Sequence, residues 1–103
     1  MEENIDKRYL PYGSVVKLKE DKRQYMIIGL QVEVFEKENQ SNKYYFDYSS
    51  IMLPKGYTGE KELVLFNAKD IETVVFNGFM DKNISTYYDD IKWEVDRREK
   101  NEE

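Results

Sequence analysis

The residues that could carry acid–base chemistry in this chain are carboxylates, and two places in the sequence draw attention to them. Asp47 lies inside an aromatic run at residues 44–48, and Asp89 and Asp90 are adjacent near the start of a helical pattern. Adjacent residues on a helix point about 100° apart, so Asp89 and Asp90 cannot share a proton as a catalytic pair does. We expect them to stabilise the helix N-terminus, and we expect Asp47 to face solvent.

Cysteine and histidine, on which much enzyme chemistry depends, do not occur among the 103 residues. Zinc sites built from these residues, thiol nucleophiles and Ser–His or Cys–His pairs are therefore excluded. The five glycines form neither a G-x-G-x-x-G fingerprint nor a P-loop, because residues 55–59 lack the required Gly-Lys-Ser/Thr ending. We predict no catalytic residues, no metal, no cofactor and no enzymatic activity.

The charge of the chain argues against two classes of partner. The formal net charge is −5, the sequence pI is about 4.9, and the lysines and arginines form no cluster. The chain therefore lacks the electrostatic attraction that dominates binding to nucleic acid and anionic lipid. No apolar stretch approaches the roughly 20 residues of a membrane-spanning helix, and no secretory signal is visible. We expect no nucleic-acid partner and no membrane association.

Aromatic side chains are the groups best suited to bind a protein partner, because tyrosine and tryptophan are enriched at interface hot spots. The tyrosines of residues 44–48 have two open interpretations, which are partly buried core residues and a protein-binding surface. Trp93 lies about 200° from Ile91 and Val95 on a helical wheel. It is therefore either part of a broad apolar face or a second contact surface. The candidate partner-contact residues are Tyr44, Tyr45, Tyr57, Phe79, Tyr88 and Trp93.

Short apolar runs separated by turn residues must position these side chains, and they predict a β-rich block over residues 9–80. The expected strands cover residues 14–19, 24–36, 44–52, 63–66 and 73–76. Residues 25–28 are apolar on both faces, which predicts a central strand covered on both sides. Gly29 predicts a bulge or bend in that strand. Asn67 is expected to cap a single helical turn that ends at Ile71.

The end of the chain changes to a helical period and predicts a helix over residues 85–100. Thr86 and Asp89 match a capping box at its start. Its apolar side chains fall on one face: Tyr87, Tyr88, Ile91 and Val95. An amphipathic helix needs an apolar surface to cover. We therefore predict a single α+β domain over residues 1–103, with a flexible lead-in at 1–8. Its five-stranded antiparallel sheet is strongly bent, or forms a partly open barrel, and the C-terminal helix caps it.

The ordered set of apolar phrases resembles one known family, the domain-of-unknown-function family DUF4176 of Gram-positive bacteria. The phrases are Leu-Pro-Tyr-Gly-Ser-Val-Val-Lys-Leu-Lys at 10–19, Tyr-Met-Ile-Ile-Gly at 25–29, Phe-Asp-Tyr at 46–48, Leu-Pro-Lys-Gly-Tyr at 53–57, Leu-Phe-Asn at 65–67 with Asp-Ile at 70–71, and Val-Phe-Asn-Gly-Phe at 75–79. Together they cover about residues 9–80. The chain departs from the pattern by a longer insert near residues 35–43, and by Ser49 and Ser50 where apolar residues are usual.

Members of that family resemble accessory proteins encoded beside type VII secretion systems, near genes for toxins with an LXG-type N-terminal domain. The resemblance implies a cytoplasmic, non-enzymatic helper that binds a secreted effector as a chaperone or targeting adaptor. The alternative is an immunity protein that neutralises a secreted toxin domain, whose basic surface would suit this acidic chain. The family brings no catalytic residues, and the oligomeric state stays open.

Overall fold

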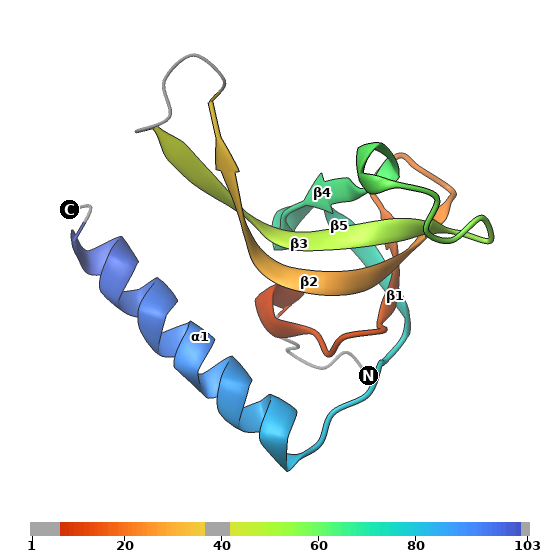
Figure 1. The fold of residues 1–103 in the computed structure, drawn as a ribbon. Coiled ribbons are helices and arrows are strands. Elements are labelled where there is room, and N and C mark those ends of the chain that lie inside the picture. Colours follow the sequence, from red (N-terminus) through yellow and green to blue (C-terminus); the bar gives the residue numbers. More distant parts are fainter. Residues whose placement is uncertain (1–6, 37–41, 102–103) are drawn as a thin grey trace.

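A computed structural model describes residues 7–36 and 42–101 of the chain (Figure 1). Its strands form one antiparallel sheet in the order β4-β3-β2-β1-β5. Their bounds are β1 (Val15–Leu18), β2 (Gln24–Phe35), β3 (Lys43–Leu53), β4 (Val64–Phe66) and β5 (Ile71–Phe76). The described residues also form three 3-10 turns, η1 (Lys7–Tyr9), η2 (Glu60–Glu62) and η3 (Ala68–Asp70), and the helix α1 (Lys82–Asn101). The predicted α+β class with a five-stranded sheet and a C-terminal helix is confirmed.

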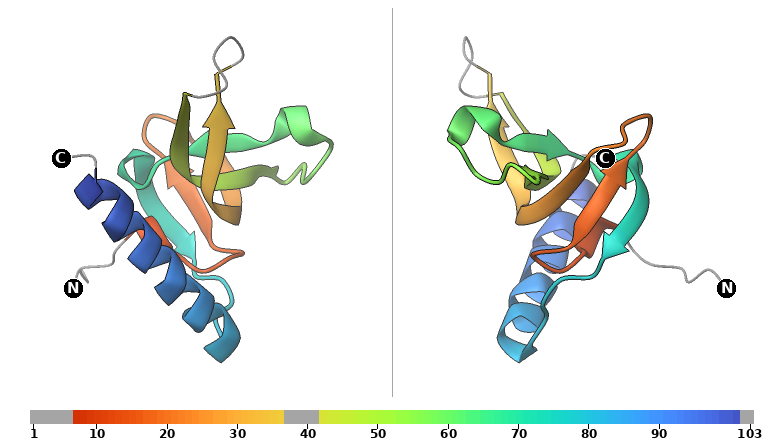
Figure 2. Two further views of the ribbon diagram at one scale, coloured as in Figure 1. Left: turned by 60° about the vertical axis from the view of Figure 1, so that its left-hand side comes forward. Right: turned by 90° about the vertical axis from the view of Figure 1, so that its right-hand side faces the viewer.

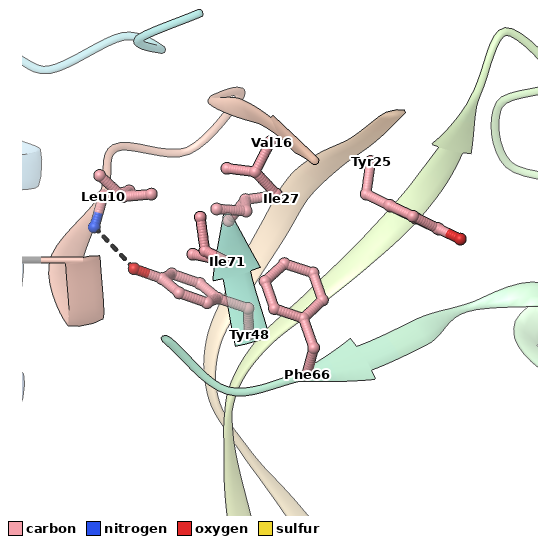
Figure 3. Packing of buried hydrophobic residues seen from close by; sticks show 7 residues of the cluster. All are labelled: Leu10, Val16, Tyr25, Ile27, Tyr48, Phe66 and Ile71. Atoms are coloured by element: carbon pink, nitrogen blue, oxygen red, sulfur yellow. Dashed lines mark hydrogen bonds between the residues drawn. The ribbon is translucent and has the colours of Figure 1, made fainter. Parts of the chain in front are cut away.

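The sheet curls around its core, because strands at both ends of the strand order contribute to one buried cluster. Phe66 comes from β4 and Ile71 from β5, and η3 connects these two outermost strands (Figure 3). The other members of the cluster are Leu10, Val16, Tyr25, Ile27 and Tyr48. The sheet is therefore open but strongly bent. Its concave side holds the core, and its other side is convex.

A β-bulge lies in the middle of β2, where the ribbon bends visibly (Figure 1). Ile27 pairs with Ser50 and Gly29 pairs with Ser49, so Ile28 is the extra residue on the bulged strand. A Cβ on Gly29 would lie 2.4 Å from the Oγ of Ser49. The bulge or bend expected at Gly29 is confirmed.

Several boundaries differ from the sequence-based expectation. β5 begins at Ile71, directly after η3, because the turn capped by Asn67 passes straight into the strand. The expected cap of that turn is confirmed, with the Asn67 N–H donating to Asp70 Oδ2 at 3.0 Å. Lys7 and Arg8 belong to η1, so part of the predicted flexible lead-in is ordered, and its residues 1–6 lie outside the described residues. Of the polar loop expected at residues 37–43, residues 37–41 also lie outside the described residues.

The start of α1 was predicted wrongly, since the helix begins at Lys82 and not at residue 85. Asp81 is the capping residue: its Oδ1 accepts a hydrogen bond from the Ile84 N–H at 2.8 Å, and its carbonyl accepts one from the Ser85 N–H at 2.8 Å. A carboxylate is favoured at a helix N-terminus because it satisfies free N–H groups. Thr86 was expected to begin the helix with a capping box, but it lies inside α1 and does not cap it.

The buried face of α1 is built from side chains three and four residues apart. Tyr88 and Val95 are buried, and Ile84 and Ile91 are partly buried. Tyr87 was expected on the same face, but it is 53% exposed. Its position directly before Tyr88 turns it about 100° away from the buried stripe. The prediction that Tyr88, Ile91 and Val95 share an inward face agrees with their burial.

α1 packs on the segment that precedes β1 and, near its C-terminal end, on the β2–β3 hairpin (Figure 2). The rings of Tyr12 and Tyr88 meet edge to face with centroids 5.4 Å apart. The Lys92 ammonium lies 5.3 Å from the ring centre of Tyr9. The helix thus contacts the intervening N-terminal segment along its length and the hairpin directly near its C-terminal end.

The main chain of Leu10 lies between two buried tyrosines. Its N–H donates to the Tyr48 hydroxyl at 2.9 Å, and its carbonyl accepts from the Tyr88 hydroxyl at 2.8 Å. The Tyr48 hydroxyl in turn donates to the carbonyl of Lys7. Because a buried peptide group must find partners inside the protein, these bonds fix the N-terminal segment between sheet and helix.

Close backbone packing at Gly78 sets the path from β5 to α1. The Gly78 N–H donates to Ser14 Oγ at 2.9 Å, and the Phe79 N–H donates to the Tyr12 carbonyl at 3.0 Å. A Cβ on Gly78 would lie 2.0 Å from the Tyr12 carbonyl oxygen and 2.6 Å from the Ser14 nitrogen. Any side chain at this position forces two backbone segments apart.

Gly78→Ala should therefore lower the free energy of unfolding by about 3 kcal/mol, at the upper end of the overpacking range, because the obstructing atoms belong to the backbone. The midpoint and slope of urea unfolding, followed by circular dichroism, measure this change. Asn77→Ala is the matched control, since Asn77 is the exposed neighbour of Gly78. Equal stability of both variants would contradict the packing described at Gly78.

Tyr88→Phe should lower the free energy of unfolding by about 1–3 kcal/mol near pH 7, because the buried Leu10 carbonyl loses its donor. Burial raises the pKa of Tyr88 above its ordinary value. Above about pH 10 the unfolded chain loses this proton while the folded chain keeps it, so folding stability falls as pH rises. The Tyr88→Phe variant has no hydroxyl at position 88 and does not lose stability in this way. The difference between the free energies of unfolding of wild type and variant should therefore shrink between about pH 8 and pH 11. Urea unfolding at both pH values tests this, and a constant difference would contradict it.

Candidate functional site

The six residues predicted to contact a partner do not form one surface. Tyr44 and Tyr45 lie at the start of β3, and Tyr57 lies four residues past its end. Phe79 belongs to the connection from β5 to α1, and Trp93 lies on the exposed side of α1. An 11-residue strand such as β3 separates its two ends by tens of ångströms along its length, since each residue adds about 3.3 Å. The six residues therefore come from separate parts of the fold.

Of these six residues, Tyr88 alone is buried. It is only 3% exposed, and its hydroxyl is engaged with the Leu10 carbonyl. Its selection as a contact residue needs a correction, because a partner cannot reach it while α1 is docked. The other five remain accessible to different degrees, with Tyr57 and Trp93 each 61% exposed and Phe79 65% exposed. Their part in binding stays a prediction.

A charged hollow of about 270 Å³ lies between the C-terminal part of α1 and the β2–β3 hairpin. Arg98 donates to Gln31 Oε1, and its guanidinium lies 3.7 Å from the ring centre of Tyr45. Arg8 pairs with Glu99 at 3.3 Å. These contacts join the end of the helix to the sheet, so the hollow is best explained as the seam between them.

The same hairpin carries a second charged group. The Glu33 carboxylate accepts hydrogen bonds from the Lys43 ammonium at 3.1 Å and from the Tyr45 hydroxyl at 2.9 Å. The bond from Lys43, followed by that from Tyr45, lowers the pKa of Glu33 below its ordinary value. The carboxylate is therefore ionised at neutral pH and already engaged with two donors, which suits a role in the hairpin itself.

Asp47 does not face solvent freely, as the sequence suggested, and this expectation was wrong. Its Oδ2 accepts from the Ala68 N–H at 2.8 Å, and its Oδ1 accepts from the Gln31 amide at 3.1 Å. Its own N–H donates to Asn67 Oδ1 at 2.9 Å. The side chain therefore supports the first turn of η3 from the neighbouring strand. This is a structural use of the carboxylate that explains its place in an aromatic strand.

At the opposite end of β2, a hollow of about 390 Å³ contains the carboxylate of Asp21. Arg23 binds it in a two-pronged arrangement, with Nε 3.0 Å from Oδ1 and Nη2 3.2 Å from Oδ2. The Tyr25 hydroxyl adds a hydrogen bond at 2.7 Å. The hydrogen bonds from Arg23 and then Tyr25 hold the pKa of Asp21 well below its usual range. This ionised network closes the turn between β1 and β2.

The largest feature that the sequence-based reasoning missed is an apolar surface on the convex side of the sheet. Cross-strand partners point to the same face of a sheet. Val15 pairs with Met26 and with Phe76, and Met26 pairs with Ile51, so these four side chains form a row across four strands. Ile28 and Val75 lie beside this row, at the irregular positions of β2 and β5. We call this set the outer patch: Val15, Met26, Ile28, Ile51, Val75 and Phe76.

Three side chains of the outer patch are exposed, and the other three, Val15, Met26 and Ile51, are partly buried. Phe76 is 60% exposed, Val75 46% and Ile28 42%, whereas the row on the other side of the same strands is buried or packed against the core. The sequence did carry a signal, because residues 25–28 are apolar on both faces. We expected cover on both sides. The structure buries Tyr25 and Ile27, whereas on the other face Met26 is partly buried and Ile28 is 42% exposed.

The described residues include neither a metal-binding cluster nor a helix suited to span a membrane. No group of three or more carboxylate, histidine or cysteine side chains that could hold a metal ion occurs among residues 7–36 and 42–101. Over the same part of the chain, no helix combines the length and the apolar character that crossing a membrane requires.

Comparison with known proteins gives one positive result. The sequence profile of a domain of unknown function, DUF4176, matches residues 9–86. No curated protein and no solved structure matches the chain. The matched region contains all five strands and the first turn of α1, and it is well over half of the chain. The chain therefore belongs to the DUF4176 family.

Proposed function

We propose that this chain is a non-enzymatic, protein-binding accessory factor. The outer patch is the observation that carries this proposal. An apolar surface that crosses four strands costs free energy while it faces water, and such contiguous surfaces mark interaction sites in proteins. Phe76 alone presents on the order of 100 Å² of apolar surface, worth about 2.5 kcal/mol when buried.

Membership of the DUF4176 family supports a narrower role. The family resembles accessory proteins encoded beside type VII secretion systems, near genes for LXG-type toxins. We therefore propose a cytoplasmic chaperone or targeting adaptor that binds an LXG-type effector before its secretion. An uncovered apolar surface suits such a role, because it is available until the effector binds.

The test is co-expression of the chain with the LXG-type protein encoded beside it, followed by affinity purification and size-exclusion chromatography. We expect a stable complex at micromolar concentration, because one well-packed apolar surface supports affinities in that range or tighter. An effector of the same class from an unrelated gene cluster is the control. Failure of the pair to co-elute at micromolar concentration would contradict the proposal.

Truncations of the effector separate the adaptor role from the immunity role. A complex with the N-terminal or linker region supports the adaptor, whereas a complex with the isolated toxin domain, together with loss of its toxicity, supports immunity. The net charge of −5 favours immunity only if the toxin domain is basic.

A further inference from the structure

We infer that α1 is a lid that opens as a unit, about the short connection after β5, while the sheet and the N-terminal segment stay folded. The observation that carries this inference is the composition of the core. Among the described residues, every member of the buried core cluster, and every side chain packed against it, lies between Leu10 and Val74. Tyr88 and Val95 of α1 are also buried, but neither belongs to this cluster. The core of the sheet is therefore complete before the helix begins.

The helix is attached through a narrow stripe and through pairs at the surface. Over residues 82–100, all side chains are exposed except those of Ile84, Tyr88, Ile91, Val95 and Arg98. The ion pair between Arg8 and Glu99 joins side chains that are 40% and 57% exposed. The Lys92 ammonium adds a cation–π contact with the Tyr9 ring. Such pairs each contribute little to stability at the surface, because water competes for the charged groups.

The main chain of Leu10 loses only one of its two bonds to tyrosine when the helix leaves. Its carbonyl accepts from the Tyr88 hydroxyl, and opening exposes both groups to water, which satisfies them. Its N–H still donates to the Tyr48 hydroxyl, and its side chain still lies in the core (Figure 3). Further along the same segment, the Gly13 N–H donates to the Ile27 carbonyl of β2 at 2.8 Å. The N-terminal segment therefore stays attached to the sheet without the helix.

The hinge lies between two attachments of the connecting segment. Gly78 and Phe79 are hydrogen-bonded to the residues just before β1. Asp81 caps the first turn of α1 and moves with the helix. Met80 lies between these attachments and is 39% exposed, so rotation of its main chain disturbs little packing. A change of a few dihedral angles at a terminus of an element is the usual form of a hinge.

Opening uncovers an apolar stripe of the helix that the closed state hides. Its members are three and four residues apart and share one helical face: Ile84, Tyr88, Ile91 and Val95. In the closed state the Tyr88 ring also meets the Tyr12 ring edge to face. Most of the stability of a helix in a protein comes from packing of its apolar face. The opened helix therefore frays, and its main-chain amides become accessible to water.

Single thiols measure the opening directly, because the chain has no cysteine of its own. Val95→Cys places a thiol under the lid, and Val16→Cys is the matched control in the core, since these valines are 3% and 0% exposed. In native buffer, Val95→Cys should react with iodoacetamide at least ~100-fold faster than Val16→Cys, because opening breaks far fewer contacts than global unfolding. The rate for Val95→Cys should rise little with urea, whereas that for Val16→Cys should follow the slope of global unfolding. Equal rates with equal urea dependence would contradict the inference.

A core substitution added to both thiol variants separates local opening from global unfolding. Ile71→Val weakens the buried cluster and touches no contact of the lid. Val16→Cys should then react about two- to tenfold faster, as expected for the loss of one buried methyl group. The rate for Val95→Cys should stay unchanged. If both thiols accelerate by the same factor, the helix leaves only when the whole molecule unfolds, and the inference is wrong.

Hydrogen exchange of the unmodified chain gives the same answer without any substitution. The amides of Tyr88 and Val95 should exchange at least ~10-fold faster than that of Ile27, because they open with the lid. The Leu10 amide should exchange as slowly as that of Ile27, since it stays bonded to Tyr48. Exchange of Leu10 together with α1, or equal protection of helix and core, would overturn the inference. These experiments need no partner, so their result is independent of the proposed function.

Discussion

The position of the helix depends on one peptide segment, the main chain of Leu10. A tyrosine of the sheet, Tyr48, accepts its N–H, and a tyrosine of the helix, Tyr88, donates to its carbonyl. Both hydroxyls are buried, and a buried polar group left without a partner costs more than an ordinary hydrogen bond contributes. The two tyrosines therefore have few alternative arrangements. Sheet, N-terminal segment and helix are held together as three layers in that order.

This arrangement decides which surface stays free. The N-terminal segment lies between the sheet and α1, where the main chain of Leu10 is bonded to Tyr48 on one side and Tyr88 on the other (Figure 2). The close backbone contact at Gly78 directs the chain from β5 towards the helix position. Phe76, Val75 and Ile28 of the outer patch stay exposed. The charged seam between Arg98, Gln31 and Tyr45 adds a second attachment that keeps the helix end on the hairpin.

The fold was largely predictable because its signals are local. Alternating apolar residues defined the strands, and Gly29 indicated the bulge. The helix start was missed because Asp81 was not weighed as a cap, and Tyr87 was misplaced because adjacent residues cannot both lie at the centre of a helical stripe. Asp47 and the outer patch were missed for another reason. Their surroundings come from Ala68, Gln31 and the cross-strand register, which no local pattern specifies.

The bond between the main chain of Leu10 and Tyr88 spans 78 residues of sequence, and β1 completes its pairing only with β5. Contacts between such distant residues form late, because the intervening loop must close first. During synthesis, β1 and β2 leave the ribosome well before the residues that enclose their concave side. Until the last third of the chain has been made, β2 exposes apolar side chains on both faces. The newly made protein therefore passes through an interval in which these apolar side chains face water and expose it to aggregation.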